Sequence, residues 1–173
     1  MKKIFFLSLF ALLSFSTFGQ TDSYEAKNEG WLVDIDKAFA ESEKTGKPIL
    51  ANFTGSDWCG WCMRLTRTVF SQKEFQTWAD KNVVLLELDF PKRKQLPQKY
   101  QQQNAQLASA FGVSGYPTVW VFNLSKDDKG NFSIEGLGKT GYTKTAKKFT
   151  TDVDQMIARG KANKKKGEGS GEE

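Results

Sequence analysis

The 173-residue sequence contains no histidine. This absence excludes a Ser-His or Cys-His catalytic pair, a histidine general base and a histidine-ligated zinc site. Two cysteines alone are also too few soft ligands for a structural zinc site within one chain. With only four prolines and 39% hydrophobic residues, the composition is typical of one globular domain rather than of a collagen-like or largely disordered protein.

The first residues have the pattern of an export signal. Lys2 and Lys3 provide a positive start, the run from Ile4 to Phe18 is uncharged and mostly apolar, and Thr17 and Gly19 are small residues at the positions that a signal peptidase reads. We expect cleavage after Gly19. The alternative is a retained anchor, but a run of about 15 residues is shorter than the roughly 20 that a spanning helix needs.

The predicted mature chain is a soluble protein of the periplasm or the cell exterior, where a cysteine pair can exist oxidised. We expect no stable membrane insertion after signal cleavage. The formal net charge is +5, and two of the lysines lie in the segment expected to be removed, so nucleic-acid binding is not expected.

Apolar periodicity predicts alternating helices and strands in the first half of the chain. The expected elements are a helix over 36–45, a strand over Ile49–Thr54, a helix from Cys59 to about Phe70, a helix around Phe75–Ala79 and a strand over Val83–Phe90. The last strand is nearly all apolar, which favours a central parallel strand over an edge strand. Because parallel strands need a crossover, the helices between the two strands complete a βαβ unit.

The second half begins with a lysine- and glutamine-rich stretch over 91–103, which we expect to be a surface loop. The pattern then predicts a helix ending at Gly112, a strand from Thr118 to near Phe122, an antiparallel strand over Phe132–Leu137 and a last helix over about Lys144–Arg159. The expected organisation is a signal peptide (1–19), a polar lead-in (20–30), one domain (31–160) and a disordered charged tail (161–173).

The chemistry-bearing motif is Trp58-Cys59-Gly60-Trp61-Cys62. Two cysteines three positions apart can form a disulfide across the first turn of a helix, where unpaired backbone N–H groups stabilise a thiolate on the first sulfur. Cys59 is therefore the expected nucleophile, and Cys62 the thiol that resolves its mixed disulfide with a partner. Haem attachment through CxxCH fails because Met63 follows the motif, and a zinc ribbon lacks its second cysteine pair.

The context of the motif resembles the thioredoxin superfamily. The run Phe-Thr-Gly-Ser-Asp-Trp-Cys-Gly-Trp-Cys at 53–62 is similar to that of exported bacterial thioredoxin-like proteins, and the resemblance extends over about Trp31–Arg159. It implies an α/β fold with a central mixed β-sheet flanked by helices on both faces. It also implies a cis peptide bond before Pro117, with Tyr116 and Thr118 flanking a peptide groove. Trp58, Gly60 and Trp61 are the other expected substrate-binding residues.

Two positions depart from the family pattern. A buried aspartate and a lysine assist the resolving cysteine in the best-known thioredoxins, and Asn52 and Leu85 stand in those places here. Glu87, Asp89 or water then remains to take the proton, or the resolving step is slow. Position 61 holds tryptophan where many relatives have proline or histidine, and without that histidine a reductase or isomerase role is favoured over an oxidase.

The predicted function is a thiol–disulfide oxidoreductase acting on protein disulfides and dithiols. It needs no cofactor and no metal, and we expect a membrane-bound electron donor to keep it reduced in an oxidising compartment. The first alternative is a non-catalytic thioredoxin-like module that binds peptides or a partner in the same groove. The second is a copper or zinc carrier that uses the two thiolates.

Overall fold

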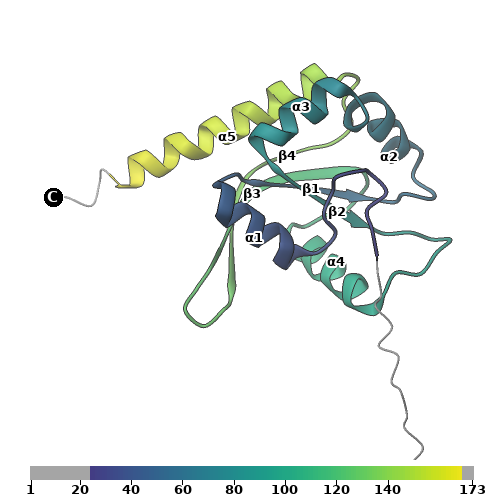
Figure 1. Cartoon of the computed structure of the whole chain (residues 1–173), viewed down its shortest axis with the longest axis horizontal. Coiled ribbons are helices and arrows are strands. Elements are labelled where there is room, and N and C mark those ends of the chain that lie inside the picture. Colours follow the sequence, from purple (N-terminus) through teal and green to yellow (C-terminus); the bar gives the residue numbers. More distant parts are fainter. Residues whose placement is uncertain (1–23, 169–173) are drawn as a thin grey trace, which may run out of the picture.

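The computed structural model describes residues 24–168, so the predicted signal peptide (1–19) lies outside the described residues. Figure 1 shows a sheet between two layers of helices. The elements are α1 (Ile35–Thr45), β1 (Ile49–Thr54), α2 (Gly60–Leu65), the π-helix η1 (Thr66–Phe70), α3 (Lys73–Asn82), β2 (Val84–Asp89), α4 (Gln98–Ala110), β3 (Thr118–Lys126), β4 (Phe132–Thr140) and α5 (Ala146–Glu168). The expected α/β fold, with a mixed sheet flanked by helices on both faces, is confirmed.

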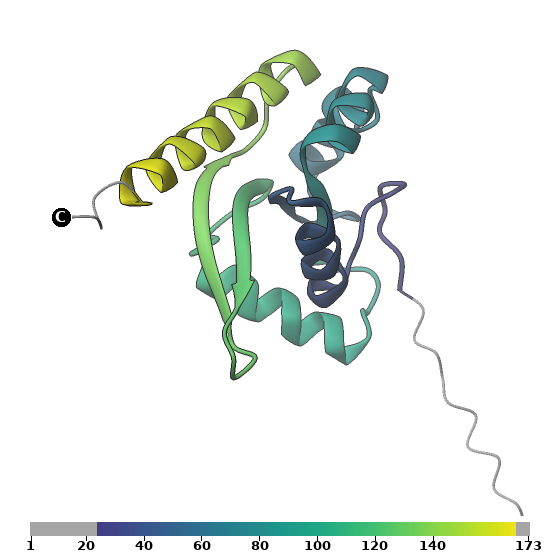
Figure 2. The same cartoon turned by 60° about the vertical axis from the view of Figure 1, so that its left-hand side comes forward.

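The sheet has the strand order β2-β1-β3-β4. β1 pairs in parallel with β2 and antiparallel with β3, and β3 pairs antiparallel with β4. The predicted βαβ unit is therefore present, with α2, η1 and α3 as its crossover. The β3–β4 hairpin projects beyond the helices, as Figures 1 and 2 both show.

Alternating side chains of the strands bury a core on each face of the sheet. Leu50, Val119 and Val121 pack on one face against residues of α2, η1, α3 and α5, which include Leu65, Phe70, Phe75 and Phe149. The other face packs against α1 and α4 through Ala51, Phe53, Leu86, Leu88, Phe39 and Phe111. Fully burying one large apolar side chain contributes about 1.5–3 kcal/mol, so the first of these two cores, through Leu65 of α2, holds the helix that carries the cysteines against the sheet.

The position of β2 differs from the prediction, because β2 lies at an edge of the sheet rather than in its centre. Its outer side is covered by the chain that precedes α1: the N–H of Leu32 donates to Leu85 O at 2.9 Å, and the N–H of Glu87 donates to Leu32 O at 2.8 Å. Apolar residues on both faces are thus compatible with an edge strand when another segment covers that edge.

The lead-in before α1 is also more than a polar linker. The carboxylate of Glu87 on β2 accepts hydrogen bonds from the N–H of Lys27 at 2.6 Å, and from the N–H and side-chain amide of Asn28 at 3.2 and 2.6 Å. Tyr24 stacks at 5.1 Å on Tyr100 of α4. Burial raises the pKa of Glu87 despite these hydrogen bonds. The segment 24–30 is therefore attached to the domain.

Two helices are longer than predicted. α4 begins at Gln98, inside the stretch expected to be a loop, because Tyr100 and Asn104 are buried on its inner side. α5 continues to Glu168, so residues 161–168 of the predicted disordered tail are helical, whereas 169–173 lie outside the described residues. Extending an existing helix needs no new nucleus, and the alanine and lysines of this stretch are good helix formers. Among the described residues no helix has the length and apolar character that a bilayer span requires.

Candidate active site

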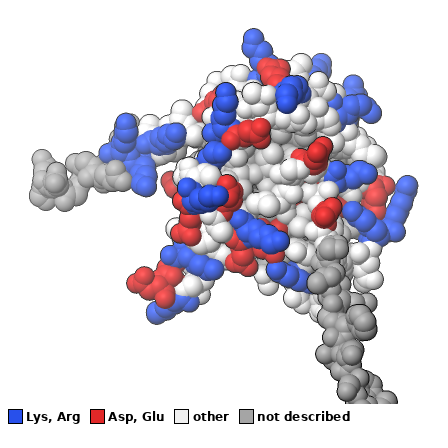
Figure 3. Space-filling view, viewed as in Figure 1, with Lys and Arg blue, Asp and Glu red and all other residues white. Residues whose placement is uncertain are grey.

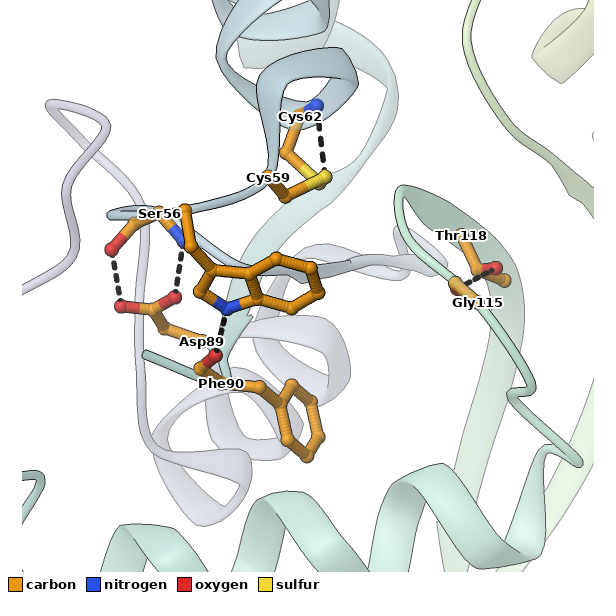
Figure 4. Close-up of a disulfide and its surroundings, with 8 residues drawn as sticks. Ser56, Cys59, Cys62, Asp89, Phe90, Gly115 and Thr118 are labelled. Carbon is orange, nitrogen blue, oxygen red and sulfur yellow. Dashed lines mark hydrogen bonds between the residues drawn. A yellow bond between two sulfur atoms is a disulfide. The ribbon is translucent and has the colours of Figure 1, made fainter. Parts of the chain in front are cut away.

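The two cysteines form a disulfide where the turn after β1 enters α2. Cys59 is the N-cap of α2 with extended backbone dihedrals, and Cys62 lies in its first turn, with 5.2 Å between the Cα atoms. The backbone N–H of Cys62 donates to Cys59 Sγ at 3.2 Å, as Figure 4 shows. The first sulfur therefore lies among helix N–H groups that have no partner within the helix, as the motif spacing predicts.

The two sulfurs differ only slightly in exposure. Cys59 is 6% exposed and Cys62 is 3% exposed, so both sulfurs are buried in this disulfide form. The residues between them are open to solvent: Gly60 is exposed, and Trp61 is 55% exposed. Gly60 and Trp61 therefore form the solvent-exposed part of the motif.

The loop before Cys59 is fixed to the end of β2 and to the segment that follows it. Asp89, which is 1% exposed, accepts hydrogen bonds from the N–H of Ser56 at 2.8 Å and from its hydroxyl at 2.6 Å (Figure 4). The carboxylate of Asp57 accepts from the N–H groups of Lys92 and Arg93 at 2.9 and 2.7 Å. These two N–H groups lower the pKa of Asp57, with that of Lys92 having the larger effect. The cysteine loop and the segment after β2 are thus one hydrogen-bonded unit.

Trp58 belongs to the same unit. Its indole N–H donates to Phe90 O at 2.8 Å, and its ring covers Gly55 so closely that a Cβ there would lie 2.5 Å from the indole. Tyr116 contacts Trp58 edge-on, with 5.9 Å between ring centres. Trp58 is half-buried, and its hydrogen bond and packing position the loop.

The peptide bond between Tyr116 and Pro117 is cis, which confirms the expectation for this proline. The segment from Gly115 to Thr118 faces the disulfide in Figure 4, and the Thr118 hydroxyl donates to Gly115 O at 2.8 Å. A Cβ on Gly141 would lie 3.3 Å from Pro117 O, so the β4–α5 connection passes close to the proline. The fold therefore brings Tyr116 from a distant part of the sequence to the loop before Cys59, where it contacts Trp58.

Trp61 is surrounded differently from Trp58. Its ring packs at 4.9 Å against Tyr142, which follows Gly141. The guanidinium of Arg64 lies 5.5 Å from the centre of Trp61 and 5.7 Å from that of Tyr142. Arg64 lies one turn after Trp61 on α2, whereas Tyr142 reaches Trp61 from a distant part of the sequence through the β4–α5 connection.

Neither of the two acidic residues considered for the resolving cysteine hydrogen-bonds to it. Glu87 binds the segment before α1, and Asp89 binds Ser56 and forms an ion pair at 3.2 Å with Lys94. Asn52 is 2% exposed, and its Oδ1 has no hydrogen-bond partner within residues 24–168. In that range, no group of three or more cysteine, aspartate or glutamate side chains is arranged to hold a metal ion.

The comparisons with known proteins agree with this geometry. A family model described as thioredoxin-like matches residues 30–123, more than half of the chain. The chain belongs to this thioredoxin-like family. Disulfide bond reductase DsbH of Chlamydia pneumoniae is 29% identical over 128 residues, which cover 74% of this chain and 76% of that protein.

Solved structures show the same relationship. A structure of a DsbH oxidoreductase has a TM-score of 0.64 and 27% identity, with 77% of this chain and 87% of that chain covered. A thioredoxin from Thermus thermophilus has a TM-score of 0.56 at 17% identity, with 83% and 96% covered, and shares the fold. The resemblance inferred from the 53–62 motif is thereby confirmed.

Proposed function

We propose that this chain is a thiol–disulfide oxidoreductase in which Cys59 is the nucleophile and Cys62 is the resolving thiol. The observation that carries the proposal is the Cys59–Cys62 disulfide at the start of α2, in a chain that also has the cis peptide bond before Pro117. The similarity of this chain to a protein named disulfide bond reductase supports the same chemistry.

The reaction consists of two thiol–disulfide exchanges. In the reduced protein, the Cys59 thiolate attacks one sulfur of a substrate disulfide, and the other substrate sulfur leaves as a thiolate that takes up a proton. The Cys62 thiolate then attacks Cys59 Sγ, closes the disulfide seen here and releases the second substrate thiol. Two electrons pass from the protein to the substrate, and an external dithiol must return them before the next cycle.

The start of α2 makes the first step faster by favouring the thiolate. A free cysteine has a pKa of about 8.5 and is roughly 3% thiolate at pH 7, whereas stabilising the anion by about 1.4 kcal/mol makes it roughly a quarter thiolate. The N–H of Cys62, which donates to Cys59 Sγ even in the disulfide, supplies such stabilisation directly. An uncharged pair of residues between the cysteines adds no further positive charge.

Substrate peptides are proposed to bind next to the cis-proline as an extended strand. Proline has no N–H, so the backbone of the preceding Tyr116 is free to pair with such a strand. Thr118 and Gly60 border the same region, and Trp61 offers an exposed ring for an apolar side chain, while Trp58 supports the loop beneath.

The proposed direction of electron flow follows from the residues between the cysteines, and the proposed location follows from the expected signal peptide. Without a histidine between the cysteines, we favour a reductase or isomerase over an oxidase, working on the periplasmic or outer side of the membrane after cleavage following Gly19. An oxidising compartment would leave the disulfide closed, so we propose a membrane-bound dithiol donor as partner. The folded domain is proposed to extend over 31–160.

The test is reduction of insulin with dithiothreitol as the electron source. Cys59→Ser should abolish the acceleration, and Cys62→Ser should accumulate mixed disulfides with the substrate. Both variants lose the same cross-link, so each is the stability control for the other. Activity of Cys59→Ser equal to that of the unaltered protein would end the proposal.

The exposed Trp61 and Met63, 55% and 46% accessible, also favour the second candidate, a binding module that holds peptides without turnover. A variant with alanine at both cysteines distinguishes the two functions. Retention of peptide binding with the same affinity in that variant, together with no insulin reduction by the unaltered chain, would establish the binding module.

A further inference from the structure

Two positive charges lie on the aromatic rings that adjoin the cysteines. Lys92 Nζ lies 4.0 Å from the ring centre of Trp58, which precedes Cys59. The Arg64 guanidinium lies over Trp61, between the two cysteines in sequence, and over Tyr142. Each cation thus lies over an aromatic residue that is next to a cysteine in the sequence. We call Arg64 and Lys92 the basic rim.

Neither cation of the basic rim has a carboxylate at salt-bridge distance within the described part of the chain. Two lysines that follow Lys92 in the sequence do have carboxylate partners: Lys94 pairs with Asp89, and Lys99 pairs with Asp34. Asp57 is the acidic residue nearest in sequence to Arg64, and its two oxygens accept the backbone N–H groups of Lys92 and Arg93. Asp89 is the acidic residue nearest in sequence to Lys92, and it pairs with Lys94. Figure 3 shows Lys and Arg side chains, with Asp and Glu side chains among them, on the right-hand side of the molecule, where α2 and the loop after β2 lie in Figure 1.

We propose that the basic rim selects protein partners whose reactive cysteine is flanked by aspartate or glutamate residues. The proposal rests on the proposed function, because the occupant is the polypeptide whose disulfide Cys59 attacks. Charge complementarity carries it: the rim is positive on both aromatic neighbours of the motif, and the carboxylates needed to neutralise it must come from the partner.

The position of the two cations suits this role. The Arg64 guanidinium lies 5.5 and 5.7 Å from two ring centres, and its N–H donors can form paired hydrogen bonds to a carboxylate. The lysine ammonium over Trp58 acts as a point charge that tolerates different approach directions. The rings also restrict both side chains before a partner arrives, which reduces the entropy lost on binding.

The test uses the reduced full-length mature protein and three synthetic peptides. Each peptide contains the same intramolecular disulfide, and the residues beside its cysteines are glutamate, glutamine or lysine. At low salt, the glutamate peptide should be reduced about tenfold faster than the lysine peptide, a difference typical of electrostatically steered association. At about 1 M salt, where the Debye length is about 3 Å, the three rates should converge.

Two charge-reversal variants separate the rim from the charge of the whole molecule. The Arg64→Glu/Lys92→Glu variant should reverse the order of the peptides. The matched control, Lys129→Glu/Lys165→Glu, changes the net charge equally in the β3–β4 hairpin and late in α5, away from α2 in Figures 1 and 2, and should keep the order. Because the rim also affects the Cys59 thiolate itself, each rate is divided by the rate of alkylation with uncharged iodoacetamide.

Equal rates for the three peptides in the unaltered protein would overturn the proposal. An unchanged preference for glutamate in the rim variant would overturn it as well. Failure of the proposed function is distinguishable from both results, because the unaltered protein would then reduce none of the peptides and no insulin.

Discussion

Replacing Asp89 by alanine is expected to lower the free energy of unfolding of the oxidised protein by about 3–5 kcal/mol. Asp89 lies at the end of β2, and its side chain is fully buried. It joins the strand to the loop that leads into Cys59, so its loss removes an interaction on which the position of the nucleophile depends.

The magnitude follows from the contacts of Asp89. Its carboxylate accepts two hydrogen bonds from Ser56, each worth about 1.5–3 kcal/mol because the acceptor is charged. Removing the acceptor also leaves the N–H of Ser56 without its partner, whereas the freed hydroxyl can turn to another acceptor. The pair with Lys94 adds less than about 1 kcal/mol, because that lysine is 46% exposed.

Urea unfolding followed by circular dichroism measures the change. Ser56→Ala, which removes only the hydroxyl and its one hydrogen bond to the carboxylate, is the matched control and should cost about 1.5–3 kcal/mol. Asp89→Asn should lie between the two, since its amide oxygen can still accept from Ser56. The alkylation rate of reduced Cys59 should also change more in Asp89→Ala than in Ser56→Ala. An unfolding free energy of Asp89→Ala within about 0.5 kcal/mol of the unaltered protein would refute this account of the loop.

Three further predictions concern the loop, the core and pH. Gly55→Ala should lower stability by about 1–3 kcal/mol and shift tryptophan emission, because its Cβ would lie 2.5 Å from the indole of Trp58; unchanged emission and stability would contradict this. Phe149→Ala should cost about 3–5 kcal/mol in urea unfolding, since Phe149 is fully buried; a cost below 1 kcal/mol would show that the core has been misassigned. Burial raises the pKa of Asp34, but hydrogen bonds, chiefly from Lys99, outweigh it, so the pKa is lowered. The contribution of the Asp34 carboxylate to stability is therefore present above the ordinary carboxyl pKa of about 3.9 and is lost as pH falls through the lowered pKa. On acidification, the urea midpoint of Asp34→Asn should decline less than that of the unaltered protein.

The residues of the motif were predictable because they are local. The spacing of Cys59 and Cys62 places both in one helical turn, and the turn residues before them interrupt the strand Ile49–Thr54 at the position that the structure shows. Local periodicity likewise indicated α1 and the βαβ unit. These features depend on interactions between residues a few positions apart, so the local sequence is enough to predict them.

The surroundings of the motif depend on contacts between distant segments. Nothing near Glu87 indicates that it binds the backbone of Lys27, about 60 positions earlier, or that this segment covers an edge strand. The pairing of Asp89 with Ser56 also requires the register of β1 and β2, which apolar patterning leaves open. The prediction of a central position for β2 was wrong, because a distant segment of the chain covers this edge strand.

Sequence alone determined that a disulfide-forming pair opens a helix after a buried strand, and that a proline-led strand follows later in the chain. Only the tertiary structure decided which groups surround the pair: Asp89 holds its loop, Tyr142 packs on Trp61, and Lys92 lies on Trp58. The physical reason is that helix and strand formation reflect short-range backbone preferences, whereas the electrostatic environment of a sulfur is the sum over every charge and dipole that folding brings near it.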